Sequence, residues 1–284
     1  MFPLRKQYRW LLAAAAVFFI AVIGVVVSLF QSAKGGVLVL NYHQINDTEK
    51  NALTVNTEQF EAQMKYLSEN GYTAITPADM LDAWENGTQL PEKPVIITFD
   101  DGYLDNYNHA FPVLEKYQLK ATIFLISDYV NTYPNYLTWS AVQDMQQSGL
   151  IDFESHTLSH EELTKAPDLD EAKHQLVGSK QAIEWNLGKQ VNFIAYPCGE
   201  YNDDIEQATK DAGYRAAFTV NYGLAEPGED PFILDRVPIF GSNSHTLARF
   251  KLRLTLAPLF APLNKVKMEL REDHPTLASF ILVP

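Results

Sequence analysis

The sequence has almost no cysteine: Cys198 is the only one among 284 residues. A chain with a single cysteine cannot form an intrachain disulfide, so its fold must be stable without such cross-links in any compartment. A zinc site built on several cysteines is excluded for the same reason. Any metal ion bound by this chain must be held by histidine and carboxylate side chains.

Basic residues are also scarce, since 22 lysines and arginines stand against 35 aspartates and glutamates, a formal net charge of −13. Three of the basic residues, Arg5, Lys6 and Arg9, lie at the N-terminus, where residues 1–30 contain no acid. A nucleic-acid partner needs a basic surface, so this composition argues against nucleic-acid binding. Hydrophobic residues make up 46% of the chain, which is typical of a globular protein.

Charged residues are absent from residues 10–30. As an α-helix this stretch would be roughly 32 Å long, which matches the hydrocarbon core of a bilayer. The basic residues before it predict a cytoplasmic N-terminus (1–9), a signal-anchor helix (10–30) in the cell membrane, and an extracytoplasmic remainder. A cleaved signal peptide, which would leave the protein secreted, is the alternative; its apolar region is usually shorter.

After a short spacer, residues 31–36, apolar runs alternate with amphipathic stretches to about residue 240. This alternation predicts a parallel sheet covered by helices, and about seven such units fit a closed β/α barrel better than a small open sheet. The catalytic residues of such barrels lie at the C-terminal ends of the strands. We predict strands at 37–40, 73–76, 95–99, 121–126, 151–154, 191–196, 216–220 and 232–237, and helices at 57–70, 77–86, 107–117, 140–148, 169–187 and 203–212.

Two adjacent carboxylates, Asp100 and Asp101, follow the predicted strand 95–99 in the segment TFDDGY. Adjacent carboxylates are costly unless something neutralises them, and a metal ion could bind one and leave the other free for proton transfer. The alternative for this segment alone is a solvated Asp-Gly turn.

Two histidines, His156 and His160, follow the predicted strand 151–154 in the segment SHTLSH. Histidines four residues apart on a helical turn can bind one metal ion, although surface histidines are the common alternative. Together with one carboxylate from the preceding motif they would supply three protein ligands and leave positions open for water. That pattern is typical of a catalytic metal site.

Two further strand ends carry candidate residues. His43 follows the first predicted strand, and its intrinsic pKa near neutrality makes it a candidate acid, or else a structural histidine. The segment AYPCGEY, residues 195–201, predicts a tight turn after the strand 191–196. A backbone N–H in such a turn could stabilise an oxyanion, although a plain β–α turn is the alternative.

Taken together, these motifs resemble the polysaccharide deacetylase (NodB homology) family, the carbohydrate esterases of family 4, over roughly residues 36–240. TFDDGY followed about 55 residues later by SHTLSH is a specific combination. The resemblance implies a distorted (β/α)7-type barrel that binds one divalent metal ion, zinc first, with cobalt, nickel or iron as alternatives.

The resemblance also implies roles for individual residues. Asp100 would be the general base, and Asp101, His156 and His160 the metal ligands. The backbone N–H of Tyr196 would stabilise the oxyanion.

Two departures from the family pattern point to a subgroup. Ala195 stands where the family has an arginine, and the usual C-terminal histidine motif is missing, while the segment VLNYH, ending at His43, looks like that motif moved to the front. This permuted order resembles the subgroup that deacetylates poly-β-1,6-N-acetylglucosamine. By this resemblance His43 is the acid, and Arg236 takes over the orientation of Asp100; the alternative for Arg236 is a surface ion pair at a strand end.

The sequence therefore predicts an enzyme of residues 37–245 that hydrolyses N-acetyl groups from an extracellular N-acetylglucosamine polymer and releases acetate. Peptidoglycan as the substrate, and a non-catalytic glycan-binding surface protein, are the alternatives. The C-terminal extension, residues 246–284, lies outside the resemblance. It could lie on a membrane surface or pack on the barrel as a terminal helix or strand.

Overall fold

The computed structural model describes residues 35–240 and 246–279, together with residues 11, 14–20, 23–24 and 28. The segment 1–9, about half of the predicted membrane span 10–30, and His245 lie outside these residues. Among the helices formed by the described residues, none is both long and apolar enough to cross a membrane.

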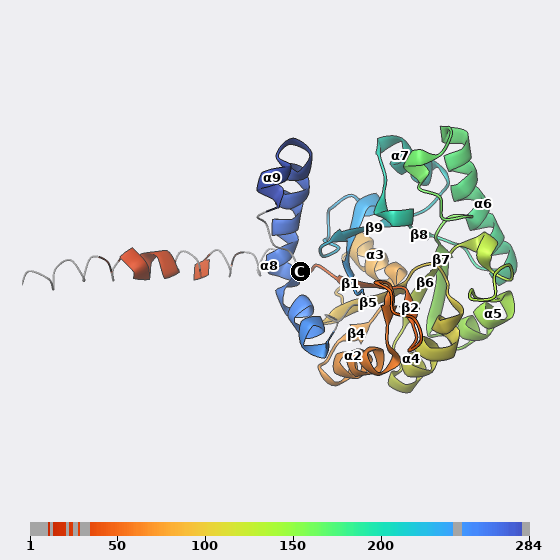
Figure 1. The fold of residues 1–284 in the computed structure, drawn as a ribbon, viewed down its shortest axis with the longest axis horizontal. Helices are drawn as coiled ribbons and strands as arrows, with labels where there is room; N and C mark the ends of the chain where they lie inside the picture. Colours follow the sequence, from red (N-terminus) through yellow and green to blue (C-terminus); the bar gives the residue numbers. More distant parts are fainter. Residues whose placement is uncertain are drawn as a thin grey trace, which may run out of the picture.

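Parallel strands form a closed barrel, as predicted (Figure 1). The first strand pairs on one side with the last strand and on the other side with β5, which closes the ring. The short strand β4 (Thr73–Ala74) pairs with β5, and β2 (Gln44–Ile45) pairs with β3 (Thr54–Val55) in a separate small sheet. The barrel strands are β1 (Leu38–Tyr42), β5 (Pro94–Phe99), β6 (Ala121–Leu125), β7 (Ile151–Ser155), β8 (Phe193–Ala195), β9 (Ala216–Tyr222) and β10 (Leu234–Pro238).

Helices cover the outside of the barrel and return the chain from one parallel strand to the next. Local sequence sets their ends: Thr76 and Asp79 form a capping box before α3, and Pro77 occupies its first turn. The helices are α2 (Thr57–Glu69), α3 (Pro77–Asn86), α4 (Phe111–Tyr117), α5 (Trp139–Gln147), α6 (Leu169–Leu187), α7 (Asp203–Asp211), α8 (Leu247–Asp273) and α9 (Pro275–Ala278). Short helical turns include η1 (Asn106–Ala110) and η2 (Ser127–Tyr129).

Side chains alternate between the two faces of each strand, so the apolar runs fill two packed layers. One buried cluster includes Val39, Ile96, Phe124, Phe218 and Leu234, one from each of five strands. The next residues along three of these strands with the same alternation are Asn41, Thr98 and Arg236, and all are fully buried. The side chains on this face therefore change from apolar to polar toward the C-terminal ends of the strands.

The C-terminal extension forms α8 and α9, which run along one side of the barrel (Figure 1). Phe250, Leu254, Ala257 and Ala261 bury one face of α8, so this part of the extension packs as a terminal helix. A second apolar stripe lies on the outer side at alternating spacings of four and three residues. It consists of Leu252, Leu256, Leu259, Leu263, Val266 and Leu270, all at least partly exposed.

Candidate metal centre and active site

The loops after β5 and β7 bring Asp101, His156 and His160 together, as the sequence predicted. One potential ligand atom from each of the three lies within 4.8 Å of the other two. Nε2 of His156 is 3.4 Å from Oδ1 of Asp101, and Nε2 of His160 is 3.5 Å from the same oxygen. The donor set therefore converges on one point, which has the dimensions of a metal site.

Two features of this cluster fit a divalent metal ion. Nδ1 of His156 lies 2.7 Å from the carbonyl oxygen of Ala195, and a hydrogen bond there leaves the Nε2 lone pair facing Asp101. Oδ1 of Asp101 is buried and accepts no hydrogen bond from the described residues. A buried carboxylate oxygen without a donor is costly, and a cation between it and the two imidazoles would remove that cost.

Four non-glycine residues around this cluster have left-handed backbone conformations. The φ angles are 74° at Asp101, 67° at Thr157, 63° at His160 and 57° at Cys198. Such conformations cost about 1–3 kcal/mol each and collect where a site needs side chains in special positions. The adjacent Gly102 has a φ angle of 76°, and a Cβ atom there would lie 2.6 Å from Cδ2 of Leu125, so a side chain at this position would strain the backbone and displace Leu125.

Asp100 is held by three charge-assisted hydrogen bonds at the polar end of the barrel interior. Arg236 donates from Nη1 to Oδ1 and from Nη2 to Oδ2, both at 2.7 Å, and Asn41 donates from Nδ2 to Oδ2 at 2.7 Å. Burial raises the pKa of Asp100, but the charge of Arg236 and then that of His156 outweigh it and hold the pKa well below its usual range. Asp100 is therefore ionised and fixed in orientation.

Arg236 is buried, so it is not the surface ion pair considered as the alternative. Its Nε donates to the carbonyl oxygen of Thr219 at 2.7 Å, Nη1 also donates to Thr98 at 3.3 Å, and the guanidinium lies 5.8 Å from the ring centre of Phe124. These contacts fix the guanidinium plane beneath Asp100.

Asn41 was not predicted as a site residue. It lies in β1 between Leu40 and Tyr42, and its side chain is fully buried. An asparagine inside an otherwise apolar strand is the signal that could have identified it, because a buried amide must find hydrogen-bond partners.

His43 follows β1 at the same end of the barrel and is partly buried. Its ring centre lies 5.9 Å from that of Phe240, and its buried Nδ1 has no hydrogen-bond partner among the described residues. Burial lowers the pKa of His43, while the charges of Asp100 and Asp101 oppose that shift. The imidazole is therefore close enough to both carboxylates to sense their charges.

The predicted oxyanion donor needs correction. The backbone N–H of Tyr196 donates to the carbonyl oxygen of Phe218 at 3.0 Å, because Tyr196 continues the pairing of β8 with β9. Pro197 has no N–H, so the next N–H of the turn is that of Cys198. The left-handed backbone of Cys198 turns the chain at this point. Burial raises the pKa of the Cys198 thiol, and the charges of Glu162, Glu200 and Asp101 raise it further, so Cys198 lies close enough to Asp101 to sense its charge.

Asp235 is a buried carboxylate on the other face of β10, next to Arg236. Burial, and then the charge of Glu229, raise its pKa to about 7. The folded state therefore binds the proton more tightly than the unfolded state, so this residue costs stability increasingly as pH rises from about 4 to 7. We expect Asp235→Asn to stabilise the protein by roughly 2 kcal/mol more at pH 8 than at pH 5.

Urea unfolding of the wild type and Asp235→Asn at the two pH values measures this difference. Asp211→Asn is the control, because Asp211 is exposed at the end of α7. A stability gain that is equal at pH 5 and pH 8 would contradict the raised pKa.

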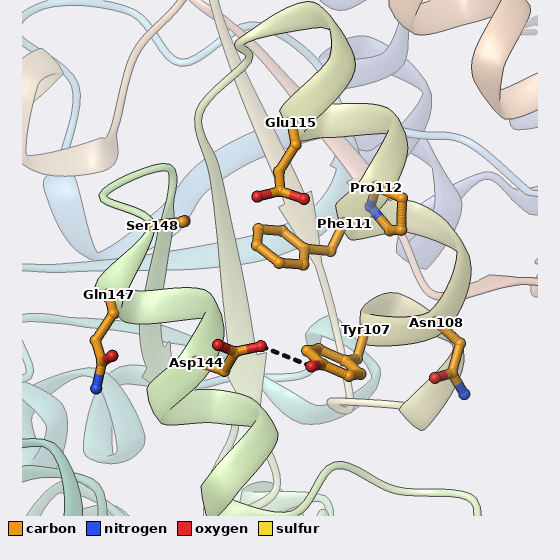
Figure 2. Close-up of a pocket in the computed structure, with 8 residues that line it drawn as sticks. All are labelled: Tyr107, Asn108, Phe111, Pro112, Glu115, Asp144, Gln147 and Ser148. Atoms are coloured by element: carbon orange, nitrogen blue, oxygen red, sulfur yellow. Dashed lines mark hydrogen bonds between the residues drawn. The ribbon is translucent and has the colours of Figure 1, made fainter.

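A groove on the outside of the barrel lies between η1, α4 and α5 (Figure 2). Tyr107 donates a hydrogen bond of 2.6 Å to Asp144 across it. The groove contains none of the residues of the Asp101 cluster and lies between helices rather than at the strand ends. Its lining residues are Tyr107, Asn108, Phe111, Pro112, Glu115, Asp144, Gln147 and Ser148.

The sequence is similar to known deacetylases. Residues 87–217 match the family described as polysaccharide deacetylase. YxkH of Bacillus subtilis, whose name assigns it to the polysaccharide deacetylases, is 37% identical over 201 residues, which cover 71% of this chain and 70% of that protein. The poly-beta-1,6-N-acetyl-D-glucosamine N-deacetylase of Staphylococcus epidermidis is 30% identical over 241 residues, which cover 76% of this chain and 83% of that protein.

Solved structures of deacetylases have the same fold. The deacetylase PplD of Streptococcus pyogenes, in complex with acetate, has a TM-score of 0.71 and 29% identity, and the match covers 77% of this chain and 97% of that one. IcaB from Ammonifex degensii has a TM-score of 0.69 and 25% identity, with coverage of 78% and 97%. The chain thus belongs to the polysaccharide deacetylase family, the carbohydrate esterases of family 4, and the enzyme class predicted from its motifs is confirmed.

Proposed function

We propose that this polysaccharide deacetylase removes N-acetyl groups from poly-β-1,6-N-acetylglucosamine and releases acetate. The observation that carries the proposal is the convergence of Asp101, His156 and His160 beside an Asp100 held by Arg236. The substrate is supported by the Staphylococcus epidermidis relative, whose name specifies this polymer. The position of His43 directly after the first strand, which resembles the permuted order of that subgroup, supports it further.

We assign one divalent metal ion to Asp101, His156 and His160, with zinc as the first candidate. When bound, such an ion polarises an acetyl carbonyl and lowers the pKa of a water molecule. The histidine and carboxylate donors also accept cobalt, nickel or iron, so metal analysis of the purified protein decides between them.

The protein groups around this position have complementary roles. Asp100 accepts a proton from the attacking water, whose oxygen bonds to the acetyl carbon, and the Cys198 N–H donates to the oxygen that becomes negative. As the bond between that carbon and nitrogen breaks, His43 in its protonated form donates a proton to the departing amine. The products are acetate and a free glucosamine unit.

Acetate release tests the proposed substrate. We expect the purified protein, supplied with zinc, to release acetate from poly-β-1,6-N-acetylglucosamine and much less from peptidoglycan. Release from peptidoglycan alone would favour the peptidoglycan alternative. Stoichiometric binding of the glycan without any acetate would favour the non-catalytic one.

His43→Ala tests the assignment of the acid. We expect kcat to fall by about 100-fold while the bound metal per chain stays unchanged, because general acid catalysis contributes on this scale. The paired variant is His245→Ala. If His245→Ala lowers kcat and His43→Ala does not, the acid has been placed on the wrong histidine.

We also propose that the catalytic domain lies outside the cell and is held at the membrane by residues 10–30. The charge-free stretch and the basic residues before it support this location. The outer stripe of α8 is flanked by Arg249 and Lys267, a pattern suited to an anionic lipid surface. Lys265 of α8 forms an ion pair with Glu226. The residue before Glu226, Ala225, is hydrogen-bonded through its backbone to Val37, which precedes β1. The helix α8 therefore lies beside the start of the barrel.

Fractionation of cells that express the full chain tests the location. An uncleaved anchor predicts that the chain stays in the membrane fraction after a carbonate wash. Release of a shortened chain, cleaved after the apolar segment, into the medium would instead support the cleaved signal peptide.

A further inference from the structure

Four tyrosines form a continuous aromatic surface beside the metal-ligand cluster. Tyr103 follows the Asp100–Asp101 pair, and Tyr129, Tyr133 and Tyr136 belong to the segment after β6. The rings of Tyr103 and Tyr136 stack with their centres 4.9 Å apart, Tyr129 meets Tyr136 edge-on at 4.9 Å, and Tyr129 meets Tyr133 edge-on at 4.8 Å. We call these four residues the tyrosine wall.

Hydrogen bonds fix the tyrosine wall to both metal-ligand loops. On the β5 side, Leu137 N–H donates to the carbonyl of Gly102 at 2.9 Å, and Leu104 N–H donates to the carbonyl of Asn135 at 2.8 Å. On the β7 side, the hydroxyl of Tyr129 donates to the carbonyl of Ser159 at 3.3 Å. The wall therefore keeps a fixed position relative to Asp101 and His160.

The tyrosine wall leads from the metal-ligand cluster to the surface. At the inner end, Tyr103 is partly buried and follows Asp101 by two residues. At the outer end the side chain of Tyr133 is 49% exposed. The distance between the centres of neighbouring tyrosine rings, 4.8–4.9 Å, is comparable to the width of one sugar ring.

The chemistry of the tyrosine wall fits a carbohydrate. The C–H face of a pyranose packs against an aromatic ring, and the phenol hydroxyls can bond to sugar hydroxyl and acetamido groups. If this segment served only to connect β6 to α5, it would not need a large ring in solvent. About half of the Tyr133 side chain is exposed, so its burial contributes little hydrophobic stabilisation.

We propose that the tyrosine wall, with Tyr133 as its outer contact, binds a neighbouring sugar of the glycan chain while the reacting sugar lies at the Asp101 cluster. This inference rests on the proposed function, and it adds a subsite for the second hexosamine. Through the tyrosine wall, the enzyme contacts the polymer at a sugar other than the one that loses its acetyl group.

Length-dependent kinetics test the subsite. With a pentamer of β-1,6-linked N-acetylglucosamine, Tyr133→Ala raises KM by about tenfold at unchanged kcat, the scale of one lost aromatic contact. With the monosaccharide, kcat/KM of Tyr133→Ala equals that of the wild type. Tyr133→Phe, which keeps the ring, stays within about threefold of the wild type on both substrates. Tyr107→Ala, in the outer groove of Figure 2, is the matched control and changes neither substrate.

Equal effects of Tyr133→Ala on pentamer and monosaccharide, or no effect on either, would overturn the subsite. Calorimetric binding of the pentamer separates this outcome from failure of the proposed function. A wild type that binds the pentamer but releases no acetate contradicts the proposed function alone. The subsite is then supported if Tyr133→Ala weakens that binding about tenfold, and overturned if binding is unchanged.

Discussion

Replacing Asp100 with asparagine is expected to lower kcat by a factor of about 10³ while the bound metal per chain stays unchanged. The amide cannot accept the proton of the attacking water. It leaves Asp101, His156 and His160 in place, and none of these side chains is hydrogen-bonded to the carboxylate of Asp100 among the described residues. Acetate release and metal content, measured on the same preparation, check both halves of the expectation.

His156→Ala is the contrasting variant. It removes one of the three donors and is expected to lose both the metal and the activity, because two remaining side chains hold a divalent ion poorly. Full activity in Asp100→Asn, or loss of its metal to the same extent as in His156→Ala, would contradict the assignment of Asp100 as the base.

Arg236→Met is expected to lower the free energy of unfolding by about 3–5 kcal/mol at neutral pH, because it leaves a buried carboxylate without its cation. In the wild type both Arg236 and Asp100 are almost fully buried. Without the guanidinium, burial would raise the pKa of Asp100 rather than be outweighed. The loss of stability should therefore be larger at pH 8 than at pH 5, and urea unfolding at the two pH values measures it.

Two further variants isolate the buried pair. In Asp100→Asn/Arg236→Met both charges are absent, so we expect most of the lost stability to return. Arg215→Met is the matched control: Arg215 also bonds two carboxylates, Asp82 at 2.7 Å and Glu85 at 2.8 Å, but these partners are largely exposed. We expect Arg215→Met to cost less than about 1 kcal/mol. A similar cost for Arg236→Met would show that the buried pair contributes little.

The order of the elements could be predicted from local sequence. The strand that ends at Phe99 and the helix that begins at Pro77 are specified by apolar runs, caps and turn residues within a few positions. The grouping of Asp101, His156 and His160 was predictable as well, because all three lie in loops that follow parallel strands. Strand ends on one side of a parallel barrel necessarily share one rim.

Contacts between distant strands were not predictable in the same way. Asn41 reads as an ordinary polar residue until β1 is seen to pair with β5, where its amide meets Asp100. Arg236 was consistent with a surface position until the closure of the barrel buried it. In both cases the partner is 59 or more residues away, and only the closed ring sets the distance.

The backbone hydrogen bonds of the turn after β8 show most clearly what the sequence determined and what the tertiary structure decided. The sequence by itself determined that a turn containing Tyr196, Pro197 and Cys198 follows a strand, because proline and glycine restrict the chain there. Only the tertiary structure decided that the N–H of Tyr196 is already bonded, because the pairing of β8 with β9 uses it. Composition and periodicity act locally and specify the helices and strands, whereas the positions of Asp100, Arg236 and the Cys198 N–H depend on how the strands align around the barrel.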